Sequence, residues 1–169
     1  PKGRSGVMRY FPGACVLMSL IVFATFPIQA DESQKFIQGS FEAILKSHKD
    51  KPLIVNFWSV TCPPCLVEMP LWKNLRLNSP EVNLVLVSTD KPEDVDRIEH
   101  VLNRYGLADA TSWIFADPFK ERLRYEIDKK WRGELPRTYF ISRNGEKKAY
   151  SGMVEETVLQ TWVKQEVGS

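Results

Sequence analysis

Residues 53–70 read LIVNFWSVTCPPCLVEMP, and this stretch decides the fold. Its first part, residues 53–58, is a continuous run of apolar, β-branched and aromatic side chains, which is typical of a strand buried on both faces. Cys62 and Cys65 follow, and a helical pattern continues from them to about residue 77. The stretch therefore predicts a buried strand that runs into a Cys-x-x-Cys motif at the start of a helix.

The spacing of the two cysteines suits thiol chemistry. Cys62 falls at the predicted helix N-terminus, where unpaired backbone N–H groups and the positive end of the helix dipole stabilise a thiolate. Cys65 lies one turn further along the same face, so the two sulfurs can close a small disulfide loop. Pro63 and Pro64 fit only in a first helical turn, where they stiffen this loop. The motif predicts that Cys62 attacks a substrate disulfide and that Cys65 resolves the mixed disulfide.

Two other uses of the cysteines remain open at this point. An inert stapling disulfide is a poor explanation, because so small a loop gains little from closure entropy. A zinc site needs a second pair of ligands, and His48 and His100 are distant in sequence and share no ligand spacing. Redox exchange is therefore the leading interpretation.

Length and composition fit one ordinary globular domain. The chain has 169 residues, of which 43% are hydrophobic and 26% charged, and this composition excludes a disordered or low-complexity chain. Three cysteines are too few for a small disulfide-stapled scaffold. A net charge of +2 argues against a dedicated nucleic-acid binder.

Residues 1–30 have the pattern of an export signal or an N-terminal membrane anchor. Lys2, Arg4 and Arg9 precede an apolar run over residues 14–26, and we expect the natural start at Met8. The basic residues of this segment account for the positive net charge, so residues 31–169 are close to neutral and form the predicted domain. The expected location is periplasmic or otherwise extracytoplasmic, either soluble after signal cleavage or tethered, with membrane contact only through an uncleaved N-terminal segment.

Strand and helix patterns alternate through the predicted domain. Such alternation predicts an α/β fold with a mostly parallel sheet covered by helices on both faces. Asn144-Gly145 is a strong hairpin signal, and we expect the last strand to be antiparallel. Pro70 predicts a kink in its helix, while Asp90 has the pattern of a cap or turn residue. The other expected strands cover residues 83–88, 112–116, 137–142 and 147–151, and the other helices residues 41–48, 92–105, a segment after 117, and 155–167.

The order of these motifs resembles the thioredoxin superfamily. The resemblance rests on the strand–Cys-x-x-Cys–helix unit, on residues 135–141 (LPRTYFI) and on the hairpin turn, and it covers about residues 33–167. Residues 62–70 (CPPCLVEMP) are similar to the exported TlpA/ResA-type thiol–disulfide oxidoreductases, which include cytochrome c maturation reductases. This implies a thioredoxin-like fold, a central mixed sheet flanked by helices, with a helical insertion near residues 92–106. Thr61 stands where the family usually has a tryptophan, and we expect it at the substrate-binding surface.

The resemblance also implies roles for single residues. Pro136 matches a cis-proline that presents the backbone of Leu135 to a bound peptide, as opposed to an ordinary trans proline opening an edge strand. Glu68 matches an active-site acid that accepts the resolving thiol's proton or shifts the thiol pKa values; the alternative is a solvated glutamate favoured by the helix dipole. Trp131 either rims the docking surface or sits in a solvated charged loop, and Trp58 is expected to pack beneath the active site.

The leading functional hypothesis is an extracytoplasmic thiol–disulfide reductase. The resemblance implies disulfide-containing exported proteins as substrates, apocytochrome c among them, and a membrane-embedded dithiol carrier as electron donor. No cofactor is expected beyond the redox-active Cys62–Cys65 disulfide, and the protein is expected to be a monomer. The alternatives are a disulfide oxidase or isomerase of the same fold and, with weaker support because no histidine follows His100, a thioredoxin-fold copper chaperone.

Overall fold

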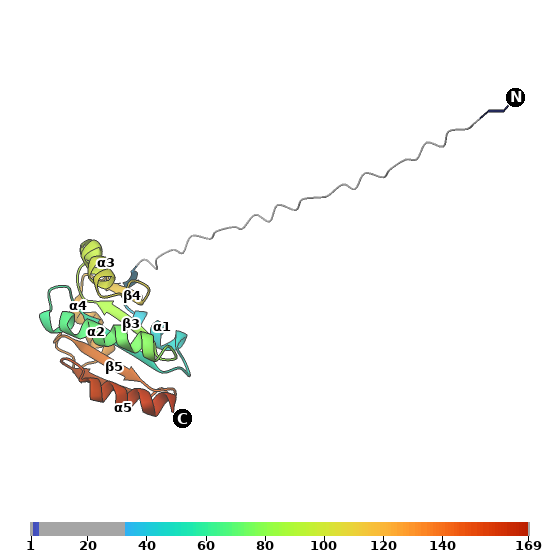
Figure 1. The fold of residues 1–169 in the computed structure, drawn as a ribbon. Helices are drawn as coiled ribbons and strands as arrows, with labels where there is room; N and C mark the ends of the chain where they lie inside the picture. The colour runs from blue at the N-terminus through green and yellow to red at the C-terminus, as the bar shows by residue number, and fades with distance from the viewer. Residues whose placement is uncertain (1, 4–32, 169) are drawn as a thin grey trace.

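The computed structural model describes residues 2–3 and 33–168 (Figure 1). The predicted leader over residues 1–30, with its expected start at Met8, lies outside the described part of the chain except for Lys2 and Gly3. Among the described residues, no helix has the length and apolar character that crossing a membrane requires.

Six strands form one mixed sheet in the order β1-β4-β3-β2-β5-β6. The first four of these are parallel to one another, β5 is antiparallel to β2, and β6 is antiparallel to β5. The sequence placed the change of direction at the last strand, whereas it already occurs at β5. The strands are β1 (Gln34–Phe36), β2 (Leu53–Trp58), β3 (Asn83–Ser88), β4 (Thr111–Phe115), β5 (Arg137–Ile141) and β6 (Lys147–Ser151).

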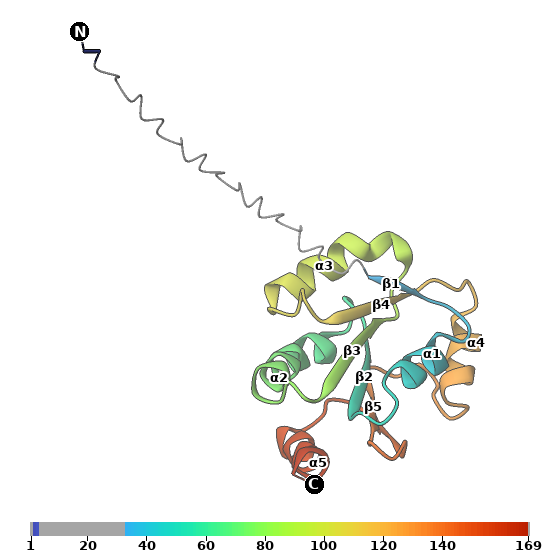
Figure 2. The same ribbon diagram turned by 90° about the vertical axis from the view of Figure 1, so that its right-hand side faces the viewer.

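Helices cover both faces of the sheet, as the alternating pattern predicted (Figure 2). The α2, α3 and α5 helices pack on one face, and α1 and α4 pack on the other. The helices are α1 (Ser40–Ser47), α2 (Pro63–Asn78), the 3₁₀ turn η1 (Pro92–Asp94), α3 (Val95–Arg104), α4 (Lys120–Ile127) and α5 (Glu156–Val167).

Strand β2 is buried along its whole length and divides its side chains between the two cores. Successive residues of a strand point to opposite faces. Ile54 and Trp58 join the core beneath α2, while Leu53, Val55 and Phe57 join the core beneath α1. Asn56 shares the side of Ile54 and Trp58, so its amide is directed towards α2.

One strand differs from the sequence prediction, while the segment after β3 agrees with it. Strand β1 was missed, because three residues carry too little pattern to be recognised. The segment 92–106 holds η1 and α3, and it leads into β4, which lies between β1 and β3 in the sheet. The helix expected near residues 92–106 and the strand expected at residues 112–116 are thus both confirmed. Helix α2 continues through Pro70 to Asn78.

Candidate active site

The two cysteines form a disulfide at the N-terminus of α2. Cys62 is the N-cap residue, and Pro63 and Pro64 occupy the first turn, where a missing N–H leaves no hydrogen bond unmade. The Cα atoms of Cys62 and Cys65 are 5.3 Å apart. The backbone N–H of Cys65 donates to the Sγ of Cys62 at 3.2 Å, so the helix start directs a donor at this sulfur.

The two sulfurs differ in their exposure. Cys65 is 1% exposed and packs in the core with Met69 and Trp72. Cys62 is only partly buried, between an exposed Thr61 and the exposed first turn of α2. An incoming partner can therefore reach Cys62, while Cys65 can be reached only from within the protein.

Glu68 is buried one turn beyond Cys65 and is 4% exposed. Its carboxylate accepts three N–H bonds: from the Val154 backbone at 2.6 Å, from Asn56 Nδ2 at 3.0 Å and from Trp72 Nε1 at 3.1 Å. Burial is the largest influence and raises the pKa of Glu68 above its ordinary value, while these three bonds lower it in part. The alternative of a solvated first-turn glutamate is therefore wrong.

Asn56 links this acid to the sheet. Its Nδ2 donates to Glu68 and also to Thr138 Oγ1 at 3.0 Å, which ties α2 and β5 to β2. Its own Oδ1 is buried and has no hydrogen-bond partner among the described residues. Asn56 was not predicted as a site residue, although a lone amide inside an apolar strand was a signal for it.

Pro136 follows a cis peptide bond from Leu135, as the resemblance implied. The register pairs Phe57 of β2 with Arg137 of β5, so Pro136 sits next to the end of β2 that leads to Cys62. Its carbonyl accepts from the backbone N–H of Gly152 at 2.9 Å. Leu135 is half-buried and packs against both cores.

The two tryptophans predicted near the site are both buried. Trp58 is fully buried in the core that includes Cys65, as predicted. Trp131 is 3% exposed, its ring centre lies 4.8 Å from that of Phe57, and its Nε1 donates to the carbonyl of Glu134. Its place in the core corrects the prediction that it rims the docking surface. The aromatic contact with β2 is more favourable than exposure to water.

A second buried carboxylate, that of Asp90, holds the loop that precedes Cys62 in the sequence. It accepts from Ser59 Oγ at 2.7 Å, from the Val60 backbone N–H at 2.9 Å and from Ser88 Oγ at 2.7 Å. The loop itself is a turn, because the Cys62 N–H donates to the Ser59 carbonyl at 3.1 Å. Sequence reasoning treated Asp90 as a cap or turn residue and missed this role.

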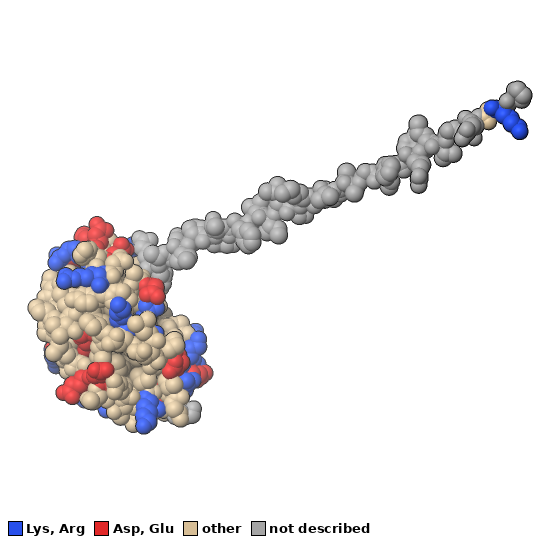
Figure 3. All heavy atoms as spheres, viewed as in Figure 1, with Lys and Arg blue, Asp and Glu red and all other residues tan. Residues whose placement is uncertain are grey.

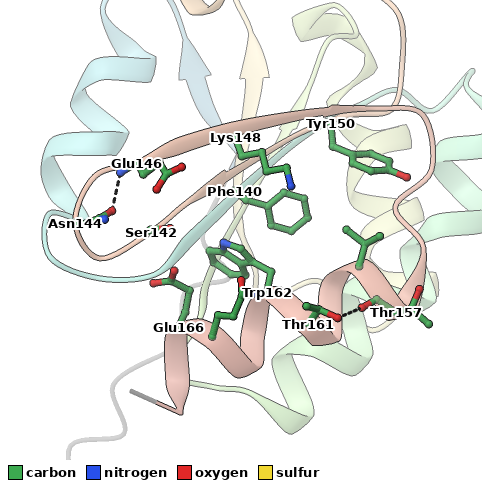
Figure 4. Close-up of a pocket in the computed structure, with 12 residues that line it drawn as sticks. Phe140, Ser142, Asn144, Glu146, Lys148, Tyr150, Thr157, Thr161, Trp162 and Glu166 are labelled. Atoms are coloured by element: carbon green, nitrogen blue, oxygen red, sulfur yellow. Dashed lines mark hydrogen bonds between the residues drawn. The ribbon is translucent and has the colours of Figure 1, made fainter.

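A separate hollow of about 570 Å³ lies between the β5–β6 hairpin and α5 (Figure 4). The rings of Phe140 and Trp162, 5.2 Å apart, lie within it, and Lys148 and Tyr150 extend into it from β6. Its lining includes neither cysteine.

Figure 3 shows acidic and basic side chains interspersed on the face in view, without a field of a single sign.

No family model matches the chain. Its sequence is 31% identical over 105 residues to a ResA thiol–disulfide oxidoreductase of Oceanobacillus iheyensis, and 31% identical over 81 residues to thioredoxin-1 of Caenorhabditis elegans. These matches cover 60% and 48% of this chain. They span 50% of the ResA protein and 65% of the thioredoxin, so this chain spans less than two thirds of either relative.

The fold is also found among solved structures. A secreted Mycobacterium tuberculosis disulfide oxidoreductase, homologous to E. coli DsbE, superposes with a TM-score of 0.58 over 71% of this chain and 85% of its own, at 20% identity. This likeness establishes the thioredoxin-like fold. The sequence is similar to the ResA-type thiol–disulfide oxidoreductases, as the residues around Cys62 and Glu68 indicated.

Proposed function

We propose that this protein is an extracytoplasmic thiol–disulfide oxidoreductase that reduces disulfides of exported proteins. One observation carries the proposal: a partly exposed Cys62 at a helix N-terminus is disulfide-bonded to a Cys65 that is 1% exposed. A thiolate is stabilised at that position of the helix, and only Cys62 is open to a large partner. The ResA relative supports the same chemistry.

The reaction begins with the reduced protein. The Cys62 thiolate attacks one sulfur of the substrate disulfide, which forms a mixed disulfide and releases one substrate thiolate. The Cys65 thiol then loses its proton and attacks the Sγ of Cys62. This step forms the Cys62–Cys65 disulfide and releases the second substrate thiolate, so two electrons have passed to the substrate. A membrane-embedded dithiol carrier is the proposed donor that reduces the protein again.

Glu68 is the proposed acceptor for the Cys65 proton. It is buried on the same helix three residues further on, and its raised pKa brings it closer to that of a thiol. Pro136 and Leu135 lie next to the end of β2 that leads to Cys62 and offer a backbone edge to which a substrate peptide can pair. The N-terminal sequence pattern supports a location outside the cytoplasm, where apocytochrome c is one candidate substrate.

The test measures the direction and the route of exchange. The full chain, reduced beforehand, is expected to reduce a protein disulfide, and Cys62→Ser is expected to abolish this. Cys65→Ser is expected to accumulate the mixed disulfide, seen as a mass increase that dithiothreitol removes. Equilibration with thiol–disulfide buffers should place the potential near the thioredoxin value of about −270 mV. A value near about −120 mV would instead make the protein a disulfide donor.

A further inference from the structure

We propose that Asp90 fixes the direction of a hydrogen-bond chain through Ser59, and thereby makes Thr61 an acceptor for a backbone N–H of the bound substrate. The proposal rests on the proposed function, because it concerns the polypeptide that Cys62 attacks. It assigns a positioning role to Asp90 and Ser59 and a substrate-contacting role to the Thr61 hydroxyl.

The hydrogen-bond chain starts at Asp90, which is 9% exposed and follows the end of β3. A carboxylate can only accept hydrogen bonds, so the hydroxyls of Ser59 and Ser88 must both donate to it. The Val60 N–H adds a third bond from the loop. These contacts hold the loop and also settle where the Ser59 proton lies.

The orientation of the Ser59 hydroxyl in turn fixes that of the Thr61 hydroxyl. The Ser59 hydroxyl has a single proton, and it is already used towards Asp90. Ser59 Oγ lies 2.9 Å from Thr61 Oγ1 and accepts from the Thr61 backbone N–H at 3.1 Å. The first of these contacts can be a hydrogen bond only if the Thr61 hydroxyl donates. The Thr61 proton therefore points inward, and only lone pairs of its oxygen remain for an external group.

Thr61 is placed to use these lone pairs on a substrate. Its side chain is exposed, and it directly precedes Cys62 within the turn that the Ser59 carbonyl closes. A polypeptide whose disulfide is attacked by Cys62 brings backbone N–H groups alongside this residue. The recognised chemistry is thus a peptide N–H that flanks the substrate cystine.

The first test compares two disulfides of different chemistry. Second-order rate constants are measured for reduction of a cystine-bridged peptide and of hydroxyethyl disulfide, which has no N–H group. Thr61→Val removes the acceptor at nearly constant shape, and it should lower the ratio of peptide rate to hydroxyethyl disulfide rate about 3- to 10-fold. Thr61→Ser should restore the ratio. The matched control Thr161→Val, an exposed threonine on α5, should leave it unchanged.

The second test removes the donor from the substrate. Peptides that are N-methylated singly at each amide flanking the cystine lack one N–H at a time. One of these peptides should be reduced by the wild type at a lower rate relative to hydroxyethyl disulfide than the unmethylated peptide is. Thr61→Val should lower that ratio no further for this peptide. Equal losses for every peptide would overturn the proposal, because they would indicate a general change in loop shape.

The third test reverses the direction of the hydrogen bonds from residue 90 through Ser59 to Thr61. In Asp90→Asn the amide oxygen stays on the Val60 N–H, so the amide NH₂ donates to Ser59. The Ser59 proton then turns to Thr61, which becomes a donor to the outside. Asp90→Asn should lower the ratio, but less than Thr61→Val does, because one lone pair of the Thr61 oxygen stays available to a substrate N–H. The double variant should lower the ratio no further than Thr61→Val alone.

The outcomes distinguish a failure of the proposed function from a failure of the role given to Thr61. If the wild type reduces neither disulfide, the proposed function fails and this proposal fails with it. If the wild type reduces both and Thr61→Val leaves the ratio unchanged, only the Asp90–Ser59–Thr61 proposal is overturned.

Discussion

One buried carboxylate, Asp90, contacts the loop that precedes Cys62, another, Glu68, follows Cys65 on α2, and the two are held by different kinds of donor. Glu68 accepts only from N–H groups, those of Val154, Asn56 and Trp72. Asp90 accepts from two hydroxyls and one backbone N–H. An N–H group has a fixed direction, whereas a hydroxyl can reverse. Glu68 can therefore vary only in its own protonation, while Asp90 can also set the orientation of the hydroxyl groups that donate to it.

The largest effect is expected on the Glu68 side. Glu68→Gln removes the proposed acceptor for the Cys65 proton and should slow resolution of the mixed disulfide about 100-fold. Rapid-quench trapping of the mixed disulfide across a pH series measures this step. The substitution should also remove the Glu68 inflection from the pH profile. The exposed Glu99→Gln on α3 serves as control. An unchanged profile would mean that Glu68 has only a packing role.

A smaller effect is expected on the Asp90 side, and it concerns stability. Asp90→Asn weakens hydrogen bonds to a buried charged group and should lower the free energy of unfolding by about 2 kcal/mol. Asp109→Asn, which breaks the exposed ion pair with Arg76, should cost less than about 1 kcal/mol. Urea unfolding of both variants measures the difference. Equal costs would show that the Asp90 contacts contribute no more than a surface pair.

The third expectation concerns the pH dependence of stability on the Glu68 side. The pKa of Glu68 is raised in the folded protein, mainly by burial. Its contribution to stability is therefore complete below the ordinary value of 4.5 and is lost as the pH rises through the raised pKa. The difference in unfolding free energy between wild type and Glu68→Gln should show this decline, and a pH-independent difference would contradict it.

The sequence predicted the parts of the fold that have strong local patterns. Strand β2, the helix that begins after Cys62 and the hairpin at Asn144-Gly145 were recognisable because apolar runs, prolines and turn residues act within a few positions. Strand β1 was missed because its pairing with β4 joins residues about 80 positions apart. The direction of β5 was likewise settled by its pairing with β2.

The candidate site was predictable where one motif contains it. Cys62, Cys65, Glu68 and Pro136 were found from the sequence, since they belong to two short segments. Asn56 and the Asp90–Ser59–Thr61 chain required the structure, because their contacts cross between strands and loops. Trp131 was misplaced for a related reason: charged neighbours suggested a surface loop, but its ring meets Phe57 of β2.

The two outer strands of the sheet affect how the protein can handle partly unfolded partners. A free strand edge is a template on which another chain can polymerise into a continuing sheet. Here one border, β1, is only three residues long, and the other, β6, begins with Lys147 and Lys148. Short length and lysine charge both discourage such growth. With the proposed function, the protein can thus release extended, disulfide-bearing chains without seeding aggregates along its own borders.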